Sequence, residues 1–113
     1  MSGDLHATAA GRILANRGRS LEHHPVVSIL SGAIGTGEFG WPSRFRGQIP
    51  LPSGTLTAEE LLPPLEENGF SLLDFTRTEL RVSFFRWTPE QGEAALDDLE
   101  PFQVLTFPRP GRA

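Results

Sequence analysis

The fold is decided by the stretch GFSLLDFTRTELRVSFFRW, which spans residues 69–87. Two apolar runs separated by a short polar turn at 76–79 predict a β-hairpin. In the second run Leu80, Val82 and Phe84 fall on one face and alternate with polar residues, as in a strand with one buried side. An isolated hairpin is at best marginally stable in water, so this hairpin needs a partner sheet.

Further strands are expected on both sides of the hairpin. The β-branched run Val26–Leu30 lies between a proline and a glycine and predicts a strand that is buried on both faces. The run 102–107 predicts a last strand, and the prolines that follow predict a disordered tail over 108–113. The segment 7–19 fits a short helix or an extended strand, because neither period dominates.

A short helix is expected between these strands. Residues 57–60, Thr-Ala-Glu-Glu, have the spacing of a capping box with Thr57 as the N-cap. Pro63 and Pro64 limit the length of this helix, and Asn-Gly at 68–69 is typical of a helix end. The acids of the segment are expected to face solvent. The sequence therefore predicts a strand-dominated α/β chain with about four strands and one or two short helices.

Composition excludes several classes of function. The chain has 113 residues, the size of one small domain, and a formal net charge of −4 with no lysine among its ten basic residues. A surface that binds duplex nucleic acid is not expected, because it needs clustered positive charge. The absence of cysteine excludes disulfides and thiolate metal sites. No signal peptide and no membrane-spanning run is recognisable, so we expect a soluble chain of unknown compartment.

The first six residues contain an acid and an imidazole two positions apart. In an extended segment Asp4 and His6 point to the same side, and oxygen and nitrogen ligands suit a hard or borderline divalent metal. A simpler interpretation is that Asp4 caps a helix over 7–14 and that His6 lies in its first turn. Spacing alone leaves both interpretations open.

A glycine-rich loop follows the predicted strand Val26–Leu30. Its residues 31–42 lack the Lys-Ser/Thr ending and the glycine spacing of a nucleotide-binding P-loop. A loop beside an active site, with Trp41 lining a pocket and Arg44 contacting an anion, agrees better with its composition. The adjacent His23 and His24 are expected to lie in a solvated loop, because neighbouring side chains of an extended segment face opposite ways.

Together these motifs resemble the C-terminal part of alkaline phosphatase D-like metallophosphoesterases, a branch of the calcineurin-like superfamily. The matching segments are Ser-Gly-Asp-Leu-His-Ala at 2–7, Pro-Val-Val at 25–27, Ser-Gly-Ala at 31–33, Trp-Pro at 41–42, Asn-Gly-Phe at 68–70 and Arg-Val-Ser-Phe-Phe at 81–85. Gly3, Asp4 and His6 match the late Gly-Asp-x-His motif of this branch. Residues 4–6 also fit the family's first Asp-x-His motif, but the strands that follow favour the late one.

The resemblance implies a fold and a chemistry. Residues 1–113 would be a single partial domain, part of a β-sandwich whose N-terminal portion is missing. Asp4 and His6 would bind a dinuclear centre of divalent metal ions, with Fe, Ca, Mn and Zn not distinguished, and Trp41 and Arg44 would contact a phosphoester substrate. The parent protein would be a phosphatase or phosphodiesterase, whereas the chain alone is expected to be inactive or very weakly active.

A second hypothesis comes from another class of protein. The chain would be a stand-alone, non-catalytic β-rich interaction module that binds a partner through an exposed sheet edge and the loop around Phe39 and Trp41. Metal affinity separates the two hypotheses, because substitution of His6 should abolish tight divalent binding only in the first.

Overall fold

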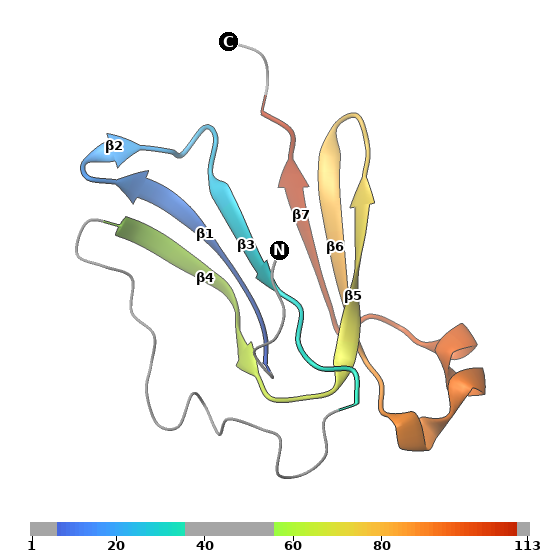
Figure 1. Cartoon of the computed structure of the whole chain (residues 1–113). Coiled ribbons are helices and arrows are strands. Elements are labelled where there is room, and N and C mark those ends of the chain that lie inside the picture. The colour runs from blue at the N-terminus through green and yellow to red at the C-terminus, as the bar shows by residue number, and fades with distance from the viewer. Residues whose placement is uncertain (1–6, 36–55, 111–113) are drawn as a thin grey trace.

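The computed structural model describes residues 7–35 and 56–110, which form two antiparallel sheets (Figure 1). The first sheet contains β1 (Thr8–Asn16), β2 (Arg19–Ser20), β3 (Val26–Leu30) and β4 (Leu56–Leu65). The second contains β5 (Gly69–Phe75), β6 (Glu79–Arg86) and β7 (Gln103–Pro108). Two 3₁₀ helices, η2 (Pro89–Gln91) and η3 (Glu93–Asp98), connect β6 to β7. The prediction of a strand-dominated chain is confirmed.

Strand β1 is the centre of the first sheet. Ala15 pairs with Ser20 of β2 on one edge and with Thr57 of β4 on the other, and β3 continues along the edge that β2 occupies. Backbone groups of β1 thus find partners in strands on both of its edges. The segment 7–19 is therefore extended, and the alternative helix over 7–14 is wrong.

The second sheet is the hairpin of the sequence analysis with one strand added. Strands β5 and β6 pair from Gly69↔Arg86 to Phe75↔Leu80, and β7 pairs along the other edge of β6. The hairpin and the last strand are confirmed to within one residue at each end. Strand β7 runs through Pro108, where the tail was expected to begin, and the Arg109 N–H donates to the Thr78 carbonyl at 2.7 Å. Residues 111–113 lie outside the described part.

The core lies between the two sheets. Its buried residues are Ala10, Ile29, Leu62, Val82 and Phe84, contributed by β1, β3, β4 and β6. Val82 and Phe84 are both 0% exposed, as the period-two pattern of the hairpin predicts. The two sheets therefore form a β-sandwich in which β6 supplies the centre of the inner face.

Strand β3 is present at the predicted residues, but its burial differs from the prediction. Ile29 is 3% exposed, whereas Val26 is 53% exposed. The strand lies beside β1 with only one face toward the second sheet, so alternate side chains face solvent. The expectation of a strand buried on both faces is wrong for this reason.

The predicted helix from Thr57 is also wrong, because residues 56–65 form β4. Thr8 pairs with Leu65 and Ala10 with Leu62, so one residue of β1, Ala9, stands opposite two of β4, Pro63 and Pro64. A β-bulge tolerates proline because the extra residue leaves the hydrogen-bonded ladder. The two prolines would limit a helix that begins at Thr57 to less than two turns, which is too short to be stable alone. Burial of Leu62 and pairing with β1 therefore outweigh the local capping signal.

Candidate functional site

Three segments that are far apart in the sequence meet at one end of the sandwich (Figure 1). Ala7, the residue after His6, is 1% exposed, and Thr8 begins β1. The Gly32 N–H donates to Thr8 Oγ1 at 3.3 Å, which ties the start of the glycine loop to the start of β1. The chain that follows the Asp-x-His pair is therefore fixed against the loop.

The same loop residues also contact the start of β5. Ser31 Oγ donates to Ser71 Oγ at 3.3 Å, and the Gly69 N–H donates to the Ala33 carbonyl at 3.0 Å. The chain after β3 thus leaves the first sheet and runs beside β5, the first strand of the second sheet. We call the set Ala7–Thr8, Ser31–Ala33 and Gly69–Ser71 the junction.

Close packing at the junction requires a glycine at position 32. A Cβ built there would lie 2.8 Å from the Ala7 carbonyl oxygen and 2.8 Å from Thr8 Oγ1. Real Cβ atoms do not approach backbone oxygens so closely, so any side chain would push β1 and the loop apart.

Replacement of Gly32 with alanine is therefore expected to lower the free energy of unfolding by about 1–3 kcal/mol. Urea unfolding followed by tryptophan fluorescence measures this loss. Gly35→Ala is the control, because a Cβ at Gly35 meets only Pro89 Cγ at an ordinary 3.5 Å. Equal stability of the Gly32→Ala and Gly35→Ala variants would show that the junction is loosely packed.

The residues that the sequence indicates as functional lie outside the described residues. These are the metal-ligand pair Asp4 and His6 and the substrate contacts Trp41 and Arg44, together with Phe39 of the alternative hypothesis. Within residues 7–35 and 56–110, no group of three histidines or acids could hold a metal ion. In the same ranges no helix has the length and apolarity needed to cross a membrane.

Several charged residues of the described ranges form ion pairs. Arg12 Nε donates to Glu59 Oε2 at 2.5 Å across β1 and β4, and Arg86 forms an ion pair with Glu67. Arg86 also lies over the ring of Phe102, with its Cζ 3.9 Å from the ring centroid. These pairs are half-exposed and contribute modestly to stability. Two of the acids that were expected simply to face solvent are thus paired with arginines, Glu59 from β4 and Glu67 from the connection between β4 and β5.

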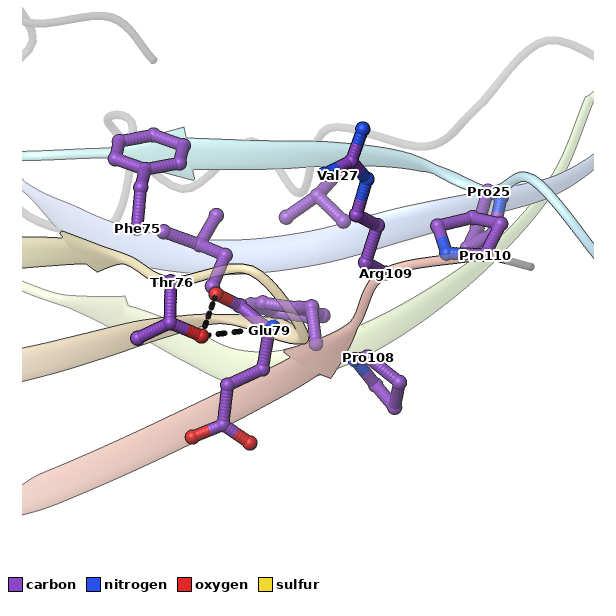
Figure 2. A pocket seen from close by; sticks show the side chains of 10 residues that line it. Pro25, Val27, Phe75, Thr76, Glu79, Pro108, Arg109 and Pro110 are labelled. Atoms are coloured by element: carbon purple, nitrogen blue, oxygen red, sulfur yellow. Dashed lines mark hydrogen bonds between the residues drawn. The ribbon is translucent and has the colours of Figure 1, made fainter. Parts of the chain in front are cut away.

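Two adjoining hollows open at the other end of the sandwich, where β3 begins and β5 and β7 end. Figure 2 shows the residues that line the first of them. The first has a volume of about 370 Å³ and a largely apolar wall. The second is lined by charged and imidazole side chains and has a volume of about 620 Å³. No local sequence pattern predicts them, because their walls come from four separate segments of the chain.

No protein-family model, curated protein or solved structure matches this chain. Functional inference therefore depends on the residues, on their arrangement in the sandwich and on the stated resemblance.

Proposed function

We propose that this chain is the C-terminal part of a metal-dependent phosphoester hydrolase and that it contributes Asp4 and His6 to the metal shell. The substrate would be a small phosphoester, and Trp41 and Arg44 of the glycine loop would contact it. The remaining metal ligands would come from a preceding part of the same domain.

The observation that supports the proposal is the junction. Three of the segments that carry the resemblance are Ser-Gly-Asp-Leu-His-Ala at 2–7, Ser-Gly-Ala at 31–33 and Asn-Gly-Phe at 68–70. The Gly32 N–H donates to Thr8, the residue that follows the first segment, and the Gly69 N–H donates to the Ala33 carbonyl. Motifs that act together in one site need such a common, rigid support, because ligands placed on a frayed terminus bind metal poorly.

The donor types agree with the proposed metal. A carboxylate and an imidazole are the ligands expected for Mn²⁺, Zn²⁺ or Fe²⁺ in a chain without cysteine. When bound, such ions polarise the phosphoryl group and lower the pKa of the attacking water. Two side chains do not complete a dinuclear site, and the described residues supply no further cluster of ligands. The proposal therefore requires the missing N-terminal part for turnover.

Metal affinity tests the proposal directly. In a calorimetric titration of the metal-free chain with Mn²⁺, His6→Ala and Asp4→Asn are each expected to weaken binding at least about tenfold, because each removes a ligand or its immediate support. The matched control is the double variant His23→Ala/His24→Ala, which removes two exposed imidazoles of the segment before β3. An equal loss in the control, or no Mn²⁺ binding by the unaltered chain, would overturn the proposal.

A second candidate function is the non-catalytic interaction module, which one observation favours. Leu72, Ser83 and Val104 lie in register across β5, β6 and β7 on the outer face of the second sheet. Leu72 is 57% exposed and Val104 is 44% exposed. An apolar row of this kind suits contact with another protein surface. Unchanged Mn²⁺ binding in the His6→Ala variant would favour this candidate.

A further inference from the structure

The two hollows at the open end of the sandwich share one wall. Pro25 and the segment 108–110 line both of them. The first hollow is closed on its other sides mainly by Val27, Phe75 and Phe107. Its volume is within the range of small-molecule sites, which are usually lined by apolar side chains with a few polar groups.

Phe75 is exposed in a way that core packing does not explain. It is paired with Leu80, whose side chain belongs to the layer between the sheets, yet Phe75 is 74% exposed. Figure 2 shows its ring beside β3 at the rim of the first hollow. An aromatic ring at an open apolar hollow offers a flat surface to an apolar group of a ligand.

The shared wall also carries a positive charge. Arg109 lines both hollows, and among the described residues its guanidinium has no ion-pair partner. Its backbone N–H is fixed by the Thr78 carbonyl at 2.7 Å, so the residue is anchored although its side chain is free to meet a ligand. A guanidinium presents a planar set of donors that matches oxyanions.

The acidic residue of the first hollow does not neutralise this charge. Glu79 Oε1 accepts from Arg81 Nη2 at 3.2 Å, and Figure 2 shows the Glu79 carboxylate directed away from Arg109. The second hollow adds His23, His24 and Arg12 beside Glu22, but Arg12 is already paired with Glu59. Among the residues that line the hollows, Arg109 is therefore the arginine available to an anion, whereas the wall of the first hollow favours an apolar group.

From this arrangement we propose that the end of the sandwich binds a small molecule in which a flat apolar group is joined to an anionic group. The apolar group would occupy the first hollow against Phe75, and the anion would meet Arg109. An exposed ion pair alone contributes little, so binding depends on having both parts in one molecule.

This site is separate from the metal motif. Strand β3 begins at the hollows and ends near Gly32 of the junction, and the extended chain from Val27 to Gly32 spans about 16 Å. The proposal does not rest on the proposed function, since neither Asp4 nor His6 takes part in it. A ligand that cannot be hydrolysed therefore tests this site independently of the proposed phosphoester hydrolysis.

The probe is naphthalene-1-sulfonate, titrated into the metal-free chain in EDTA and followed by amide chemical shifts in NMR spectra. We expect it to bind at least about tenfold more tightly than sulfate, because sulfate forms the charged contacts without any apolar burial. The largest shifts are expected at 75–80 and 107–109. Shifts centred on another part of the chain, or affinity no higher than that of sulfate, would overturn the proposal.

Substitutions locate the two contacts. Arg109→Ala and Phe75→Ala are each expected to weaken binding roughly tenfold, because one removes a charged hydrogen bond and the other an aromatic wall. The matched controls are Arg19→Ala, an exposed arginine outside both hollows, and Leu72→Ala on the outer face, and neither should change affinity more than twofold. Equal losses in variants and controls would contradict the site. If Arg109→Ala does not give a native amide spectrum, Arg109→Gln takes its place.

Discussion

Replacing Phe84 with alanine is expected to lower the free energy of unfolding by about 3–5 kcal/mol. Phe84 is 0% exposed and is one of the two largest fully buried side chains of the described residues. Its ring lies 6.3 Å from the ring of Phe102, in a tilted arrangement that adds to the area it buries. Strands on both sheets hold the surrounding side chains, so the cavity left by alanine cannot collapse fully.

Chemical denaturation with urea measures this loss, with the denaturant slope checked for two-state behaviour. The control is Phe75→Ala, which makes the same chemical change at a ring that is 74% exposed. We expect the control to change stability by less than about 1 kcal/mol. A similar loss in both variants would mean that the layer between the sheets is not the core of the fold.

The hairpin was predictable because its signal is both local and repeated. Alternation of Leu80, Val82 and Phe84 fixes one face of β6, and a one-residue slip would place Arg81 in the core. The same pattern predicts which residues are most buried, and Val82 and Phe84 are confirmed as such. The pattern does not reveal the partner sheet, since the residues that cover β6, Ala10, Ile29 and Leu62, lie between 20 and 74 residues away in the sequence.

The incorrect prediction of a helix at residues 57–65 has a different cause from the success at the hairpin. A capping box describes how a helix begins, but it says nothing about whether a neighbouring strand competes for the same backbone groups. Here β1 provides that competition, and the bulge absorbs Pro63 and Pro64. Only the pairing of two distant segments decides between helix and strand, and a single sequence carries weak evidence for such pairing.

The candidate sites also differ in whether a local sequence pattern or the pairing of distant segments determines them. The Asp4–His6 pair is visible in the sequence because chelation depends on a short spacing. The junction and the hollows are not visible, because each is assembled from segments that are remote in sequence. Phe75 looks like an ordinary strand residue and Arg109 like part of a terminal tail, until β5 and β7 place them around one opening.

Replacing Gly69 with alanine is the other change expected to have a severe effect, with a loss of about 3 kcal/mol or more in the free energy of unfolding. A Cβ at this position would lie 2.0 Å from the Phe85 carbonyl oxygen and 3.1 Å from its carbon. These are backbone atoms of the paired strand, so no rotamer change relieves the overlap. The Gly69 N–H is also bonded to Ala33 on the opposite side, which prevents β5 from moving away without breaking the junction.

Urea unfolding measures the effect of this clash on stability, and titrations with Mn²⁺ and naphthalene-1-sulfonate measure its effect on the two proposed sites. Gly35→Ala is again the control, because its added Cβ makes only an ordinary contact. If the Gly69→Ala chain still folds, the opened junction should weaken Mn²⁺ binding, while naphthalene-1-sulfonate binding at the opposite end should change little. Loss of both affinities together in a folded variant would mean that the sandwich moves as one body and that the two sites are coupled. Stability equal to that of the control would show that the first residue of β5 is not paired with the last residue of β6.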